Sequence, residues 1–275
     1  MLEIPLGKKI KYKDSYDRSI LFPIKRSLNR NKRTSKLNPL FYGYDLWNCY
    51  EISWLNHKGK PEVRIIHFIV PADSEYLIES KSIKLYFNSF NNTKFINEEE
   101  IFNIIKNDLS NLTGSVVEVL VNKLDHYHRK PLKLFDGVLL DDIDTEILDY
   151  YTSSALLQTE SYPAVHVKES VYSNLFKSNC LVTGQPDWAS VQIKYIGQKI
   201  NHPSLLKYLI SYRNHNAFHE DCVEQIYIDI LEKCKPKELS VYAKYTRRGG
   251  IDICPFRTNL DLKNVKVINN RDVRQ

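Results

Sequence analysis

The sequence lacks several features by which protein classes are commonly recognised. No run approaches the roughly 20 apolar residues that a transmembrane helix needs, and the first 18 residues, MLEIPLGKKIKYKDSYDR, lack the apolar middle of a signal peptide. A Gly-x-Gly-x-x-Gly motif is absent, so a Rossmann dinucleotide site is not supported. We therefore expect a cytoplasmic protein whose cofactor, if it has one, binds in another way.

Cysteine is scarce and irregularly spaced. The 275 residues contain five cysteines and no Cys-x-x-Cys pair, which argues against a disulfide framework and against a zinc ribbon. We expect reduced thiols. The five are Cys49, Cys180, Cys222, Cys234 and Cys254.

Positive charge is concentrated at the N-terminus. Residues 1–36 hold eleven of the 39 Lys and Arg residues against three acidic residues, although the whole chain has a formal charge of only +6. Blocks of like charge are often tails, so we expect a solvated, partly mobile basic arm over residues 1–36. Binding of tRNA by this arm is the alternative. We expect no direct nucleic-acid binding, because no basic face with groove-reading or aromatic elements is visible in the rest of the chain.

The first half of the chain predicts strands around one helix. Residues 44–56 and 60–73 are expected to form two strands joined by a turn at residues 57–59. Residues 97–112 have apolar residues at helical spacing behind an acidic first turn, which is typical of a helix. Residues 114–124 predict a further strand.

Residues 79–91, ESKSIKLYFNSFN, combine a polar head with apolar residues. Ile83, Leu85 and Phe87 alternate, which predicts a strand with these three on its buried face. On that pattern Lys84 points to solvent. Four polar residues, from Glu79 to Ser82, are an unusual start for such a strand.

The second half repeats the order of elements. We predict an α+β protein built of antiparallel sheets with helices packed on one face, with one module over residues 37–125, a connection over 126–160 and a second module over 161–275. The expected elements of the second half are a strand at 187–197, helices at 202–214 and 219–234, and a strand at 238–250.

The stretch SNCLVTGQPDW contains a candidate nucleophile and a candidate acid. Gly184 and Pro186 predict a turn that brings Asp187 back toward Cys180. A thiolate is a strong nucleophile, and a carboxylic acid can protonate a nitrogen as charge develops on it. The alternative is a buried cysteine that acts as a small hydrophobic residue, followed by an ordinary turn.

Two further polar stretches are candidates for binding. His219 and Glu220 begin a predicted helix. Glu220 is suited to accept hydrogen bonds from a planar N–H edge, and His219 supplies an imidazole, the side chain commonly used for proton transfer. Acidic helix starts are also common for structural reasons. Arg248 offers a planar fork of donors for phosphate, and Gly249 permits close backbone approach. A solvated strand end is the alternative there.

Four separated stretches together carry a family resemblance. ESKSIKLYFNSFN, SNCLVTGQPDW, NHNAFHEDCVEQIYIDI and YTRRGGIDICPFRTN closely resemble the NADPH-dependent 7-cyano-7-deazaguanine reductases, the nitrile reductases of queuosine biosynthesis. The first matches the family signature at every position from Glu79 to Tyr86, and Cys180 lies in the other half, as in two-module members. The resemblance implies tandem tunnelling-fold (T-fold) modules, related to GTP cyclohydrolase I, in a homodimer.

The resemblance also implies residue roles. Cys180 is implied as the nucleophile that forms a thioimidate with the nitrile, and Asp187 as the proton donor. The implied cofactor is NADPH, two molecules per turnover, and no metal is required. The implied substrate-binding residues are Ile78, Glu79, Ser80, His219 and Glu220, and the implied cofactor-binding residues are Ser80, Lys81, Arg248 and Gly249.

Two other enzyme classes stay open. A cysteine-dependent nitrile or amide hydrolase would also pair a thiol with carboxylates, but it has no use for a phosphate clamp at Lys81 and Arg248. A zinc-dependent, cyclohydrolase-like enzyme would use Cys180 and His219 as ligands, but no third ligand stands at a recognisable spacing.

Overall fold

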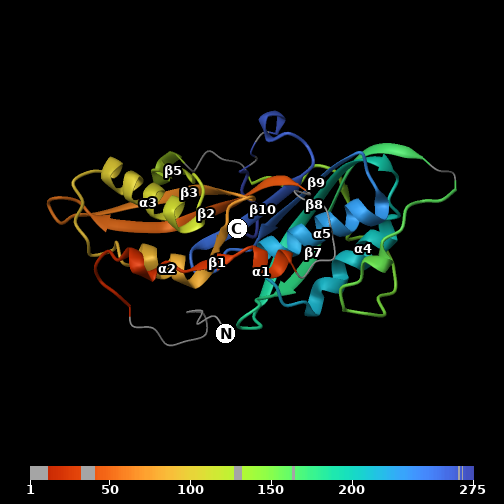
Figure 1. Cartoon of the computed structure of the whole chain (residues 1–275), viewed down its shortest axis with the longest axis horizontal. Helices are drawn as coiled ribbons and strands as arrows, with labels where there is room; N and C mark the ends of the chain where they lie inside the picture. The colour runs from red at the N-terminus through yellow and green to blue at the C-terminus, as the bar shows by residue number, and fades with distance from the viewer. Residues whose placement is uncertain (1–11, 32–40, 127–131, 163–164, 266, 268) are drawn as a thin grey trace. The chain divides into compact units, whose positions relative to one another are not determined.

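The computed structural model describes residues 12–31, 41–126, 132–162, 165–265, 267 and 269–275. The chain forms two compact units (Figure 1). The described residues of unit 1 fall within Met1–Thr34, Tyr44–Lys130 and Arg247–Ile253, and those of unit 2 within Ser35–Gly43, Pro131–Thr246 and Cys254–Gln275.

Unit 1 is an antiparallel sheet with two helices on one face. Its strands β2 (Tyr42–Leu55), β3 (Pro61–Pro71) and β5 (Glu118–Asn122) lie in the order β5-β3-β2. Helices α2 (Ser80–Asn88) and α3 (Glu98–Thr113) share an aromatic-rich core with β2 and β3. A separate two-stranded sheet joins β1 (Pro23–Lys25) and β4 (Tyr76–Ile78).

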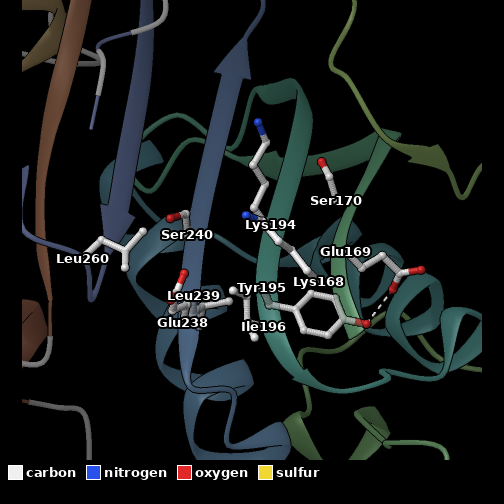
Figure 2. A pocket seen from close by; sticks show the side chains of 10 residues that line it. All are labelled: Lys168, Glu169, Ser170, Lys194, Tyr195, Ile196, Glu238, Leu239, Ser240 and Leu260. Atoms are coloured by element: carbon white, nitrogen blue, oxygen red, sulfur yellow. Dashed lines mark hydrogen bonds between the residues drawn. The ribbon is translucent and has the colours of Figure 1, made fainter. Parts of the chain in front are cut away.

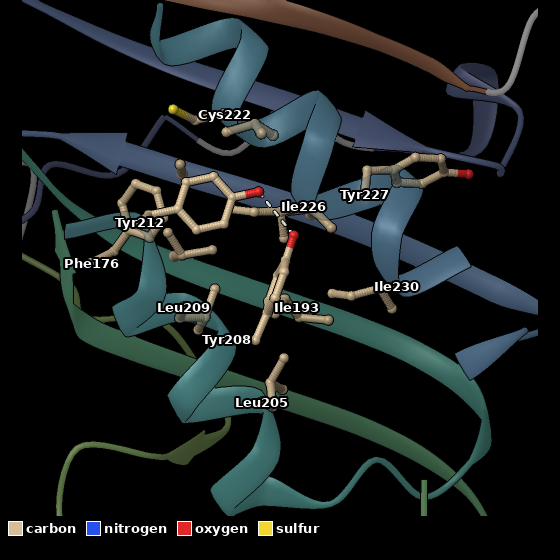
Figure 3. Close-up of a cluster of buried hydrophobic side chains, with 14 of the residues drawn as sticks. Phe176, Ile193, Leu205, Tyr208, Leu209, Tyr212, Cys222, Ile226, Tyr227 and Ile230 are labelled. Atoms are coloured by element: carbon tan, nitrogen blue, oxygen red, sulfur yellow. Dashed lines mark hydrogen bonds between the residues drawn. The ribbon is translucent and has the colours of Figure 1, made fainter. Parts of the chain in front are cut away.

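Unit 2 has the same kind of architecture. Its sheet has the order β10-β9-β8-β7-β6, antiparallel except for the β6–β7 pair, and α4 and α5 cover one face. Figure 3 shows its core, in which the hydroxyls of Tyr208 and Tyr212 are 2.8 Å apart. The elements are β6 (Val138–Leu139), β7 (His166–Asn179), β8 (Pro186–Gln198), α4 (His202–Ile210), α5 (His219–Cys234), β9 (Glu238–Tyr245) and β10 (Ile251–Thr258).

Short helices complete the described chain. They are η1 (Arg18–Ile20), α1 (Ser27–Arg30), η2 (Leu124–His126), η3 (Ser154–Leu156), η4 (Ser211–Asn214) and η5 (Leu262–Asn264). The predicted α+β class with antiparallel sheets is confirmed.

The two units repeat one plan. In chain order, β2, β3, α2, α3 and β5 correspond to β7, β8, α4, α5 and β9. A register shift interrupts the first strand pair in both units, and α3 and α5 each run for 16 residues to a left-handed end residue. In both, the end of the first strand also bridges to the segment before the long helix, through Leu55 and Lys94 in one case and Asn179 and Asn216 in the other.

Residues 80–88 form a helix, so the predicted strand is wrong. The buried residues of α2 are Ser82, Ile83, Tyr86 and Phe87, which recur at the three- and four-residue spacing of a helix. The carboxylate of Glu79 accepts the backbone N–H groups of Lys81 (2.8 Å) and Ser82 (2.6 Å). The polar head of this stretch is therefore a helix cap, which satisfies N–H groups that have no partner within the helix.

Residues 12–31 are part of unit 1, and side chains from Tyr16 to Arg26 pack into it, so the prediction of a solvated arm is wrong for this part of the stretch. Tyr16, Ile20 and Leu21 contact the core of the unit. Arg26 is 3% exposed; its Nη2 lies 2.6 Å from the carboxylate of Asp45, and its Nε donates to the hydroxyl of Ser74. The arm's residues 1–11 and 32–36 lie outside the described residues.

We expect Arg26→Leu to lower the free energy of unfolding by about 3–5 kcal/mol, because it removes the guanidinium that pairs with the buried Asp45 carboxylate. Arg18→Leu is the matched control: Arg18 is 65% exposed and lies 3.9 Å from Asp108, so it should cost less than about 1 kcal/mol. Urea unfolding of both variants measures the difference. Equal, small losses would contradict the buried placement of Arg26.

Candidate functional site

The hairpin between β7 and β8 holds Cys180 in a hydrogen-bonded turn. The backbone N–H of Cys180 donates to the carbonyl of Gln185 (2.8 Å), and that of Gly184 donates to the carbonyl of Cys180 (3.0 Å). Gly184 has a φ of +67°, the left-handed region in which glycine carries no steric penalty. Cys180 is partly exposed, whereas the other four cysteines are buried.

Burial distinguishes the remaining thiols from Cys180. Burial raises the pKa of Cys222 to about 12 and that of Cys234 to about 11, and it raises the pKa of Cys49 well above its ordinary value. These thiols stay protonated at neutral pH, and the thiolate is the reactive form. Among the five thiols, accessibility therefore favours Cys180 as the candidate nucleophile.

Asp187 and His219 meet beside this turn. Asp187 pairs across the strands with Ser178, two residues before Cys180. Its carboxylate is 4% exposed, and Oδ2 lies 3.3 Å from Nε2 of His219, the first residue of α5. Asp187 and His219 thus form a contact between a buried carboxylate and a partly accessible imidazole.

Backbone hydrogen bonds at Asn179 position the start of α5 next to the turn. The N–H of Asn179 donates to the carbonyl of His215 (2.8 Å), and the N–H of Ala217 donates to the carbonyl of Asn179 (3.1 Å). The residue before Cys180 is therefore tied on both sides to the segment that leads into His219. Glu220, also predicted as a site residue, follows in the first turn of α5 and is 4% exposed.

The predicted site residues of unit 1 surround the start of α2. Ile78 ends β4, Glu79 is the cap of α2, and Ser80 and Lys81 form its first turn. Ile78 and Glu79 are buried, while Ser80 and Lys81 are partly exposed. Burial raises the pKa of Glu79, and the backbone N–H groups of Lys81 and Ser82 partly offset this. Ionisation of Glu79 therefore rises with pH over a range above that of an ordinary glutamate.

Gly249 and Gly250 form a tight turn in unit 1. Arg248 and Ile251 exchange backbone hydrogen bonds of 2.9 and 3.3 Å across it. The φ angles of the two glycines, +59° and +78°, are those of a type I′ turn, which requires left-handed conformations at both central residues. Glycine is therefore demanded here by backbone conformation.

Lys84 lies against this turn, and sequence reasoning missed it. A Cβ atom on Gly249 would lie 3.2 Å from Cδ of Lys84. The two residues line a cavity of about 120 Å³, together with Glu51, Ile52, Phe87, Asn88, Gly250 and Ile251. The prediction that Lys84 faces solvent is wrong because it assumed a strand: in a helix, Lys84 lies one turn after Ser80 and Lys81.

The larger described cavity lies elsewhere. It measures about 510 Å³ and occupies unit 2 near the start of β7, whereas Cys180 follows the end of that strand (Figure 2). Lys168, Lys194, Ser170 and Ser240 are among the residues that line it (Figure 2). None of the predicted site residues line it. Cavity size alone therefore does not identify the predicted site residues.

Two kinds of feature are absent from the described residues. No group of three or more His, Cys, Asp or Glu side chains there is placed to hold a metal ion. Within the same residues, no helix is both long and apolar enough to cross a membrane.

The structure thus divides the predicted site residues into two groups. Unit 2 holds Cys180, Asp187, His219 and Glu220 at one corner, where the Asp187–His219 contact is direct. Unit 1 holds Ile78, Glu79, Ser80 and Lys81 around the start of α2, and Arg248 and Gly249 in the turn beside Lys84.

Known proteins resemble both halves of the chain. Residues 12–121 match the family described as "Nitrile reductase, 7-cyano-7-deazaguanine-reductase N-term", and residues 186–264 match the family described as "QueF-like protein". The second segment includes Asp187 and Gly249, while Cys180 precedes it.

Similar proteins cover nearly the whole chain. A protein of Cupriavidus necator is 52% identical over 94% of this chain and 93% of its own length. A relative from Ralstonia nicotianae is 50% identical over 94% of this chain and 93% of its own length. A relative from Paraburkholderia phytofirmans is 49% identical over 94% of each chain. All three are named NADPH-dependent 7-cyano-7-deazaguanine reductase. This chain therefore belongs to the NADPH-dependent 7-cyano-7-deazaguanine reductase family.

Proposed function

We propose that this protein reduces the nitrile of 7-cyano-7-deazaguanine to an aminomethyl group with NADPH, giving 7-aminomethyl-7-deazaguanine for queuosine biosynthesis. Family membership supports the reaction class. The observation that carries the mechanism is the corner of unit 2, where the one cysteine that is not buried adjoins the contact between Asp187 and His219.

Cys180 is proposed as the nucleophile. Its thiolate forms a bond to the nitrile carbon, and the electron pair of one C–N π bond moves to nitrogen, which takes a proton from Asp187. The product is a thioimidate on Cys180. Covalent attack divides a difficult reduction into easier steps. Nε2 of His219 lies 3.3 Å from the Asp187 carboxylate, just beyond hydrogen-bond reach, so a small approach of the two groups allows them to exchange a proton.

The residues around Gly249 fit a phosphate-bearing cofactor. The turn has no side chain at Gly249, and Lys84 lies directly against it. Ser80 and Lys81 are in the first turn of the same helix as Lys84, and Arg248 flanks the turn. NADPH, when bound, supplies hydride, and two molecules provide the four electrons of the reduction. We propose that Ser80, Lys81, Lys84, Arg248 and Gly249 hold its charged groups and leave room for close backbone approach.

Glu79 and Glu220 are proposed to bind the deazaguanine ring. Both carboxylates are almost fully buried, and a carboxylate matches a planar edge of N–H donors. Ile78, Ser80 and His219 stand next to them in the chain and are proposed as further substrate-binding residues. Because burial raises the pKa of Glu79, substrate binding through its ionised form strengthens as pH rises.

Family membership and the repeated plan of the units support further proposals. We infer that residues 37–125 and 161–275 are tunnelling-fold modules joined by residues 126–160, and that the protein works as a cytoplasmic homodimer. The substrate is a small molecule, so no direct contact with nucleic acid is needed.

We expect Cys180→Ala to lower NADPH consumption with 7-cyano-7-deazaguanine by about 10³-fold or more, because the covalent route is lost. NADPH absorbance with time measures the rate. Cys234→Ala is the control: it removes a buried thiol with a pKa of about 11 and should leave the rate within about twofold of the unchanged protein. Undiminished turnover by Cys180→Ala, or NADPH-independent release of amide or acid, would overturn the proposal.

We expect Gly249→Ala to raise KM for NADPH about tenfold, because the new Cβ crowds Lys84 at the proposed cofactor site. Gly59→Ala provides the control. Gly59 also has a positive φ, +82°, but a Cβ there meets nothing closer than 3.7 Å. Both variants should lose about 1–2 kcal/mol of stability from left-handed strain. An equal KM in the two variants, measured by steady-state kinetics, would remove Gly249 from the cofactor site.

A further inference from the structure

We propose that Tyr245 is a positioning residue for the reaction: its ring supports the imidazole of His219 and holds it against Asp187. The two rings stack at a centroid distance of 3.9 Å and an interplanar angle of 23°. The inference rests on the proposed function, in which Asp187 and His219 handle the proton of the nitrile step.

The ion-pair contact alone does not fix the imidazole. Nε2 of His219 lies 3.3 Å from Oδ2 of Asp187, longer than a well-formed hydrogen bond of about 2.7–3.2 Å. A single contact at one ring atom leaves the ring plane free to turn. A stacked aromatic face constrains that plane, so Tyr245 supplies the constraint that the contact lacks.

Tyr245 is itself held firmly. It ends β9, pairs with Ala189 of β8 and is 1% exposed. The ring of Phe176 packs against it edge-on at 6.2 Å. The backbone carbonyl of Tyr245 also accepts a hydrogen bond from the side chain of Gln275 (3.2 Å). Because Tyr245 is fixed in this way, its ring can hold the partly exposed imidazole of His219 in one orientation.

Tyr245 contacts His219 through its aromatic ring and not through its hydroxyl. Its hydroxyl and that of Ser178 are buried with no hydrogen-bond partner of standard geometry, although both side chains interact with the thiol of Cys222. Burial raises the pKa of Tyr245, so the phenol stays neutral. Ser178 pairs with Asp187 across the strands, and Tyr245 stacks on His219. The cluster of Ser178, Cys222 and Tyr245 therefore adjoins both residues of the Asp187–His219 contact.

Several charged or titratable groups lie near the Asp187–His219 contact. Lys177 and Cys222 interact electrostatically with Asp187, Arg213 interacts with Lys177, and Glu220 and Asp221 follow His219 in the first turn of α5. The Tyr245 hydroxyl interacts with Cys222, and Tyr245→Phe removes that interaction while keeping the ring. A change in the His219 titration that appears in Tyr245→Met and not in Tyr245→Phe is therefore attributable to the lost stack.

The test compares Tyr245→Met with Tyr245→Phe and Tyr227→Met. Methionine fills much of the volume without an aromatic face, and phenylalanine keeps the face without the hydroxyl. Tyr227 is the matched control: it is fully buried on α5, its hydroxyl also has no partner, and it packs against Phe41. The measurements are kcat, KM for each substrate and the NMR titration of the His219 imidazole.

We expect Tyr245→Met to lower kcat about 10- to 100-fold with little change in KM for NADPH, and to shift the His219 titration. Tyr245→Phe and Tyr227→Met should keep kcat within about twofold and leave that titration unchanged. The proposal is overturned if Tyr245→Met and Tyr227→Met behave alike, or if Tyr245→Phe loses as much activity as Tyr245→Met.

A measurement on the unaltered protein keeps the proposal testable if Tyr245→Met does not fold. Stacking predicts an upfield ring-current shift of the His219 imidazole protons, and an ordinary resonance position contradicts the stack. These NMR readouts need no turnover. Failure of the proposed function, seen as no nitrile reduction by the unaltered protein, is therefore distinguishable from failure of this inference.

Discussion

The backbone hydrogen bonds of Asn179 are the constraint on which the proposed active-site corner of unit 2 depends. They tie the end of β7 to residues 215–217 and thereby bring the first turn of α5 next to Cys180. Main-chain bonds of this kind tolerate many side chains, since they use groups that every residue except proline carries in full. The chemistry of the corner can therefore be set by side chains while the frame stays constant.

Unit 1 shows the same frame with different chemistry. Leu55 makes the equivalent backbone bonds, donating to the carbonyl of Thr93 and accepting from the N–H of Phe95. Where α5 begins with His219 against Asp187, α3 begins with Glu98 in an ion pair with Arg64. At this position unit 1 carries the ion pair of Arg64 and Glu98, whereas unit 2 carries a thiol, a carboxylate and an imidazole.

Local signals in the sequence predicted much of this architecture. Helix α5 begins and ends at the predicted residues because its acidic first turn and apolar spacing are both local. Helix α2 was mistaken for a strand because Ile83, Leu85 and Phe87 alternate. Only Ile83 and Phe87 fit the helical spacing as well, and the burial of Tyr86 in place of Leu85 distinguishes the helix. The stack of His219 on Tyr245 joins α5 to β9 and has no local signal, so sequence reasoning could not find it.

Mass spectrometry of the intact protein, incubated with 7-cyano-7-deazaguanine in the absence of NADPH, tests the central claim most directly. Covalent attack by Cys180 predicts a mass increase equal to one whole substrate molecule, located on the peptide that contains Cys180. An unmodified protein, or an adduct on any other cysteine, would contradict the assignment of this corner of unit 2 as the site of nitrile chemistry.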